Sequence, residues 1–235
     1  MQNQFHAQPA LTAVQENTLL RSVYNFMLLG LAISGFTAWL ASNSDFMRSL
    51  LFGNSFTLIL LIVAEFGMVI AISRSTMTSM AASTASTLFL LFSFVNGLTL
   101  SSIFLVYDLG SIATTFFVTA ATFGATSLYG YVTKTNLSSI GNYLFMALIG
   151  LIIASVVNMF VASSALDWLI TYAGILIFVG LTAYDTQKIK NMSGKMAGIG
   201  GEQFGKIAIL GALSLYLDFI NIFLLMLRIF GGGRD

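Results

Sequence analysis

Three acidic side chains lie within long apolar stretches of the sequence: Glu65, Asp185 and Asp218. An ionisable side chain near the centre of a bilayer costs about 2.5–3.5 kcal/mol on insertion scales, so such residues commonly bind ions, carry protons or pair with another group. Asp218 stands inside the apolar run from Leu213 to Phe230. A charge at that position must be paired, protonated or hydrated. These three acids are therefore the candidate functional residues of the chain.

Two of the acids also have a structural interpretation. Asp185 comes close to the end of its apolar run, beside Lys188, and an acid at a helix end can simply face water. Glu65 precedes Arg74 by nine positions, roughly 13 Å at the helical rise of about 1.5 Å per residue, and could pair with a basic residue as part of the packing. The sequence leaves both interpretations open beside the functional one.

Most enzymatic chemistry lacks its side chains in this sequence. There is no cysteine, which excludes disulfides, thiolate metal sites and thiol catalysis, and the single histidine, His6, lies in a polar tail. An intramembrane serine protease needs a base near its serine, and a metalloprotease needs His-Glu pairs. We therefore expect a protein that is not an enzyme and that needs no cofactor.

The composition is that of a membrane protein. Hydrophobic residues make up 57% of the chain and charged residues 8%, whereas an ordinary soluble domain carries roughly 25% charged residues. So few charges cannot cover a surface that faces water. The formal net charge of +1, with scattered basic residues, argues against a nucleic-acid partner.

Continuous apolar runs, each near the roughly 20 residues that cross a hydrocarbon core, predict an all-α, polytopic membrane protein built as a bundle of seven transmembrane helices. The runs do not alternate with period two, which argues against barrel strands. Small residues four positions apart, Ala120 with Gly124 and Gly150 with Ala154, favour close helix packing. We expect a polar N-terminal tail at 1–21, a transmembrane domain at 22–231 and a short C-terminal tail at 232–235. The predicted spans are 22–41, 55–73, 84–106, 111–132, 140–162, 168–187 and 207–230.

The distribution of Lys and Arg predicts a cytoplasmic N-terminus. In that orientation the inside segments hold seven basic residues and the outside segments three. The longest break, Lys188 to Lys206, is then a cytoplasmic linker, and its glycine-rich part, Gly198 to Gly205, lacks the spacing of a phosphate-binding loop. All three acids can converge in the cytoplasmic half of the bundle. The inside residues are Arg21, Arg74, Lys134, Lys188, Lys190, Lys195 and Lys206, and the outside ones are Arg48, Arg228 and Arg234.

Two segments resemble a known family. The stretch Ser214 to Gly231, SLYLDFINIFLLMLRIFG, resembles the last helix of the Bax inhibitor family, the transmembrane Bax inhibitor motif proteins. The stretch Gly180 to Lys190, GLTAYDTQKIK, resembles the sixth helix of that family with its Tyr-Asp pair. Glu65 with Arg74 is more loosely similar to the acid and the basic end of the second helix. Because its loops are short and its size is modest, we expect a bacterial member of that family.

The resemblance implies a calcium leak that responds to protons, in which Asp185 and Asp218 share a proton or exchange it for contact with a cation. Two carboxylates in a low-dielectric site do not easily ionise together, so such a pair titrates as a unit. Calcium takes several oxygen ligands in irregular geometry, which carboxylates, carbonyls and water can supply. A protonated pair would hold the sixth and seventh helices together, and its deprotonation would admit calcium and water. Glu65 and Arg74 would have supporting roles.

Two other functions stay open. Some relatives in the family are associated with a membrane-anchored ATP-dependent protease or with control of cell death, which implies a regulatory protein that binds other membrane proteins and transports nothing. A proton-coupled transporter would also use intramembrane acids. The expected partners are the lipid bilayer, calcium and protons, with other membrane proteins as further partners of a regulator. The expected location is a bacterial inner membrane.

Overall fold

The computed structural model describes residues 8–193 and 200–232, with side chains from residue 18 onward. Within these ranges, seven helical segments are long and apolar enough to cross a membrane, which confirms the predicted all-α, polytopic class. Each overlaps one of the predicted spans. The segments are Thr18–Ser42, Ser55–Met77, Ala82–Val106, Leu109–Val132, Ser138–Val161, Ser164–Ser193 and Gly201–Phe230.

Short elements supplement the long helices, and together they divide into two compact units. Unit 1 comprises Met1–Val106 and Ile189–Tyr216, and unit 2 comprises Tyr107–Lys188 and Leu217–Asp235. Both of the last two helices therefore contribute to both units. The elements are α1 (Gln8–Ser42), α2 (Asp45–Phe52), α3 (Ser55–Ser73), the 3-10 turn η1 (Ser75–Met77), α4 (Ala82–Leu100), α5 (Ile103–Val106), α6 (Leu109–Val132), α7 (Ser138–Val161), α8 (Ser164–Ser193) and α9 (Gly201–Phe230).

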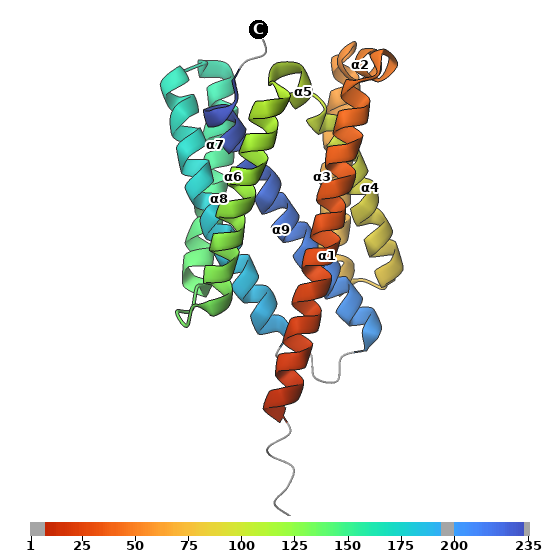
Figure 1. Ribbon diagram of the computed structural model, residues 1–235, viewed down its shortest axis with the longest axis vertical. Coiled ribbons are helices and arrows are strands. Elements are labelled where there is room, and N and C mark those ends of the chain that lie inside the picture. Colours follow the sequence, from red (N-terminus) through yellow and green to blue (C-terminus); the bar gives the residue numbers. More distant parts are fainter. Residues whose placement is uncertain (1–7, 194–199, 233–235) are drawn as a thin grey trace, which may run out of the picture. The chain divides into compact units, whose positions relative to one another are not determined.

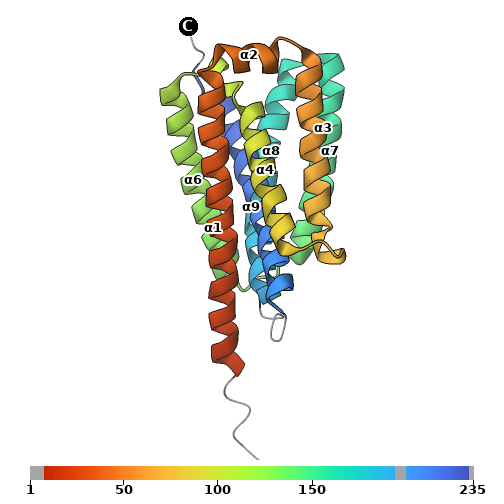
Figure 2. The same ribbon diagram turned by 90° about the vertical axis from the view of Figure 1, so that its right-hand side faces the viewer.

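In unit 1, α4 packs against both α1 and α3, and the short α2 crosses from the end of α1 to the start of α3 (Figure 2). The polar breaks in the sequence supply the helix caps. The side chain of Ser44 accepts a hydrogen bond from the Met47 amide at the start of α2, and Asn54 accepts one from the Phe56 amide at the start of α3. Such caps satisfy amides that have no partner inside the helix.

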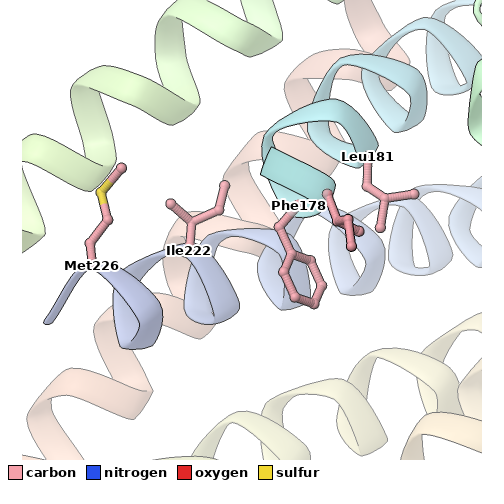
Figure 3. Close-up of a cluster of buried hydrophobic side chains, with 5 residues drawn as sticks. Phe178, Leu181, Ile222 and Met226 are labelled. Atoms are coloured by element: carbon pink, nitrogen blue, oxygen red, sulfur yellow. The ribbon is translucent and has the colours of Figure 1, made fainter. Parts of the chain in front are cut away.

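In unit 2, α6, α7 and α8 run side by side and the second half of α9 packs with them (Figure 1). The core between α8 and α9 is apolar. Figure 3 shows Phe178 and Leu181 of α8 beside Ile222 and Met226 of α9, with Met226 extending toward α6. The hydroxyl of Thr119 on α6 lies 3.5 Å from the Met226 sulfur. These four side chains are called the apolar layer below.

Large apolar side chains are exposed along α3 and α7. On α3, Val63 is 61% and Phe66 67% exposed, and on α7, Met159 is 80% and Phe160 85% exposed. In water, contiguous apolar surface of this kind would drive association. In a membrane it faces lipid tails, which is the environment that the composition requires.

The division into a polar tail at 1–21 and a transmembrane domain from residue 22 stays a prediction, and α1 begins at Gln8, within that tail. The predicted linker from Lys188 to Lys206 is wrong at both ends, because α8 continues to Ser193 and α9 begins at Gly201. Gly198, the first glycine of the glycine-rich part of this linker, lies outside the described residues. Hydropathy detects the part of a helix that lies in hydrocarbon, whereas the hydrogen-bonded helix continues into the polar zone. The amine of Lys206 is buried there and donates to the carbonyl oxygen of Thr78 at 3.3 Å.

Candidate functional site

Asp185 and Asp218 lie together in unit 2, on α8 and α9. Asp218 is 4% exposed, Asp185 is half-buried, and the two carboxyl groups interact electrostatically. The hydroxyl of Thr182 is the hydrogen-bonding neighbour of the Asp218 carboxyl and also lies 2.8 Å from the carbonyl oxygen of Phe178. The Oδ2 atom of Asp218 has no hydrogen-bond partner among the described residues. The site is thus an acidic pair in which one carboxyl oxygen of the buried acid has no partner from the described chain.

The pair is positioned by helix periodicity and by two close contacts of α8. Thr182 and Asp185 are three residues apart and so lie on one face of α8. Behind that face, Gly130 of α6 lies against the backbone of Ala183, and Gly141 of α7 lies against the ring of Tyr184. A side chain at either glycine would separate the helices. The two glycines therefore let α6 and α7 hold the segment that carries Asp185.

A set of neutral hydrogen bonds fixes the next turn of α8. The hydroxyl groups of Thr186 and Ser127 lie 2.9 Å apart and link α8 to α6. The side chain of Gln187 accepts from the Leu137 amide and donates to the Thr135 carbonyl, both at 2.8 Å. Sequence reasoning did not identify these residues. The signal that could have identified them is the run of polar residues directly after Asp185, which lies within α8.

The structure decides one alternative for Asp185. The residue is not at a helix end, because α8 continues for eight further residues to Ser193. Lys188 is the cation that interacts with Asp185, as the structural interpretation expected, but its side chain is exposed and its amine lies 5.7 Å from the centre of the Tyr184 ring. Asp185 therefore interacts electrostatically with an exposed cation, Lys188, and with the buried Asp218.

The apolar layer borders the acidic pair on one side. Phe178 and Leu181 precede Asp185 on α8, whereas Ile222 and Met226 follow Asp218 on α9. The two helices run antiparallel here, since Leu181 packs with Ile222 and Asp185 meets Asp218. All four apolar side chains consequently lie on the same side of the pair. That side of the site is lined by buried apolar side chains.

Glu65 lies in unit 1 and has neutral partners. Its carboxylate accepts hydrogen bonds from Thr99 Oγ1 at 2.7 Å and from Asn96 Nδ2 at 3.3 Å, both on α4. Arg74 ends α3, is exposed, and forms no salt bridge in the described part of the chain. Glu65 thus pairs with polar side chains and not with a basic one. The convergence of Glu65 with the two aspartates stays a prediction, because Glu65 and the aspartates lie in different units.

No group of three or more His, Cys, Asp or Glu side chains that could hold a metal ion occurs in residues 8–193 and 200–232. A cation at the acidic pair would have two carboxylates from the chain and would need further oxygen ligands from hydroxyl groups, carbonyl groups or water. Calcium and other hard cations accept such mixed oxygen ligands.

The family described as "Inhibitor of apoptosis-promoting Bax1" matches residues 16–235, which is nearly the whole chain and includes both aspartates. The chain belongs to the Bax inhibitor family. The resemblance seen at Gly180 to Lys190 and at Ser214 to Gly231 is therefore confirmed, and this Bax inhibitor family protein is an integral membrane protein.

Three bacterial relatives show how far the similarity extends. The chain is similar to the inner membrane protein YbhL of Escherichia coli strain K12, with 52% identity over 217 residues that cover 92% of each protein. It is 46% identical over 220 residues to a protein of Borreliella burgdorferi, covering 94% of each. It is 38% identical over 224 residues to a protein of Deinococcus radiodurans, covering 95% of this chain and 94% of the relative. The similarity spans all seven helical segments.

Proposed function

We propose that this Bax inhibitor family protein is a pH-sensitive leak for calcium in the bacterial inner membrane, gated by Asp185 and Asp218. One observation carries the proposal. The carboxyl group of Asp218 is deeply buried beside a second acid, and its Oδ2 atom has no hydrogen-bond partner in the described chain. Buried polar atoms in folded proteins nearly always have a partner, so an exception suggests that a ligand or a proton occupies the position.

The proton is the first such occupant. With one proton between the two carboxyl groups, a single negative charge remains, and a hydrogen bond can join α8 to α9. Loss of that proton leaves two like charges in a low-dielectric site, where they repel each other strongly. The repulsion is relieved when the helices separate or when a cation binds. A divalent cation balances both charges, which favours calcium over a monovalent ion.

The apolar layer provides the closed state of the proposed path. Apolar constrictions block ions because water leaves them, and an ion cannot pass without its hydration shell or substitute ligands. Phe178, Leu181, Ile222 and Met226 close one side of the acidic pair in this way. Opening requires α8 and α9 to move apart at that layer. Charge repulsion one turn away along the same two helices supplies a force in that direction.

We also propose that the N-terminus is cytoplasmic and that the connection between α8 and α9, predicted at Lys188 to Lys206, lies on the same side. The name of the similar Escherichia coli protein, an inner membrane protein, supports the choice of membrane. A regulator that binds other membrane proteins and a proton-coupled transporter are the competing functions.

The test is calcium flux into liposomes that contain the purified full-length chain and no other protein. We expect flux that changes with pH over about pH 5 to 8, the physiological range for titratable switches. The matched control is Asp45→Asn, which removes a 92% exposed acid and should leave the pH profile unchanged. Absence of flux from correctly inserted protein would favour the regulator. Flux that requires an imposed proton gradient would favour the transporter.

A further inference from the structure

A chain of side-chain hydrogen bonds crosses four helical elements of unit 1 and ends at Glu65. Asn96 of α4 donates to Glu65 of α3 at 3.3 Å through Nδ2. Its Oδ1 atom accepts from the hydroxyl of Tyr216 on α9 at 2.8 Å. The Tyr216 hydroxyl also lies 2.6 Å from the hydroxyl of Ser34 on α1. The two ends of the amide of Asn96 thus connect a carboxylate to a buried pair of hydroxyl groups.

The inner half of this chain is dry. Tyr216 is fully buried and Ser34 is 1% exposed. Phe89 and Phe92 of α4 pack edge-on against the Tyr216 ring, with ring centres 5.9 and 5.6 Å away. Gly97 brings the backbones of α4 and α1 into contact at Ser34. Every hydroxyl proton in this part must therefore be given to a protein acceptor.

We propose that Glu65, Asn96, Tyr216 and Ser34 form a proton-binding site separate from the aspartate pair, in which proton uptake by Glu65 reverses the direction of donation along the chain. Glu65 is the half-buried end that exchanges protons with its surroundings. Ser34 is the buried end.

With Glu65 ionised, each donor is directed toward the carboxylate. Thr99 and Asn96 both donate to Glu65, Tyr216 donates to Asn96 Oδ1, and the Ser34 hydroxyl donates to Tyr216. A carboxylate is an acceptor only, so this is the arrangement that its charge favours.

With Glu65 protonated, the same heavy atoms support the opposite arrangement. The acid now donates to Asn96 Oδ1 after the amide turns over, and Asn96 Nδ2 donates to the Tyr216 oxygen. Tyr216 donates to Ser34, whose hydroxyl has an acceptor ready in the Ser93 carbonyl at 2.6 Å. Thr99 keeps an alternative acceptor in the Val95 carbonyl at 3.4 Å. No donor loses its partner in either state, so the change costs no buried hydrogen bond.

The charged surroundings leave Glu65 as the controlling group. On the elements that pack against α3, α4 carries no ionisable side chain, η1 carries none, and α2 carries Asp45 and Arg48, which bond to each other. Tyr216 of α9 is the titratable group that faces Glu65 through Asn96, and its hydroxyl is a donor in both arrangements. Tyr216, a middle member of the hydrogen-bonded chain, precedes Asp218 by two residues on α9.

Infrared difference spectra of the purified protein between low and high pH test the proposal through the carboxylic C=O band. Glu65→Gln should remove one band. Ser34→Ala should shift that same band although Ser34 is three hydrogen bonds away from Glu65, and Tyr216→Phe should shift it as well. The matched control is Ser101→Ala, which removes a buried hydroxyl that bonds locally to the Leu98 carbonyl and lies outside the hydrogen-bonded chain. It should leave the band unchanged.

Spectra of Glu65→Gln that match those of the parent at every pH would show that Glu65 does not take up a proton. A Glu65 band that ignores both Ser34→Ala and Tyr216→Phe would show that it titrates without a relay. Either result overturns the proposal. The Asp185→Asn, Asp218→Asn double variant should retain the Glu65 band, so failure of the leak proposal and failure of the relay are distinguishable.

Discussion

Gly130 on α6 faces the backbone of Ala183 on α8 so closely that a methyl group at position 130 would lie 2.3 Å from the Ala183 carbonyl oxygen. A backbone atom cannot turn aside as a flexible side chain can. Overpacking of this kind typically costs about 1–3 kcal/mol. We expect Gly130→Ala to lower the free energy of unfolding by about that amount, measured by thermal unfolding in detergent, and to displace the segment that carries Asp185.

The same helix offers the control. A methyl group at Gly124 would meet no atom within 4 Å, and that position is exposed. Gly124→Ala should change the unfolding free energy by less than about 0.5 kcal/mol. Equal destabilisation by both substitutions would show that helix propensity or lipid contact, and not the contact with Ala183, determines the effect.

These glycines show what the sequence could not predict about packing. Four-residue spacing correctly places Ala120 and Gly124 on one face of a helix, but the face that meets another helix is decided by tertiary pairing. Neither Gly124 nor Gly150 has a neighbour within 4 Å of an added methyl group, so the prediction of close packing there is wrong. The contacts occur at Gly130 and Gly97 instead.

The acids were predictable, and their neutral partners were not. Glu65, Asp185 and Asp218 are conspicuous because a charge in an apolar run has a large cost. Asn96 and Thr182 have no such signal, since hydroxyl and amide side chains in helices often bond to the backbone of the preceding turn. Thr182 does so with Phe178 while it also contacts Asp218. Helix ends were missed for a related reason, because hydropathy does not report hydrogen bonding beyond the hydrocarbon.

Asp108 should make the start of α6 sensitive to acid. Its side chain accepts hydrogen bonds from the hydroxyl and amide of Ser111, at 2.6 and 2.9 Å, and these hold the pKa of Asp108 below its ordinary value of 3.8. A lowered pKa in the folded state stabilises the fold above pH 3.8, and this contribution is lost as the pH falls through the lowered pKa. We expect the hydrogen of the Ser111 amide to exchange with solvent faster once the pH falls below the lowered pKa of Asp108. The Asp108→Asn variant keeps an uncharged cap, so exchange at the Ser111 amide in that variant should not show this acid-dependent step.

The proposed orientation can be tested with single cysteines, because the chain contains none of its own. We expect Gly201 and Asn43, which are both exposed, to lie on opposite sides of the membrane, because five candidate spans separate them. In spheroplasts, a membrane-impermeant thiol reagent should label Asn43→Cys directly and Gly201→Cys after lysis. The reverse pattern would place the N-terminus outside. Labelling of both without lysis would contradict the count of spans.

Asp185 and Asp218 should behave as one titrating unit in the calcium flux assay. If they share a proton, either Asp→Asn substitution removes the like-charge repulsion, and each should abolish the same pH-dependent step. The double substitution should then add little, because groups that act as a unit are not additive. The measurement is flux against pH for the parent, both single variants and the double variant, with insertion checked in each.

Thr182→Val is a further variant for the same assay, because it removes the hydroxyl beside Asp218 without changing any charge. It should shift the pH at which the step occurs without abolishing the step. Independent, additive effects of the two substitutions, or a parent flux that ignores pH, would leave two unrelated buried acids and no gate between α8 and α9.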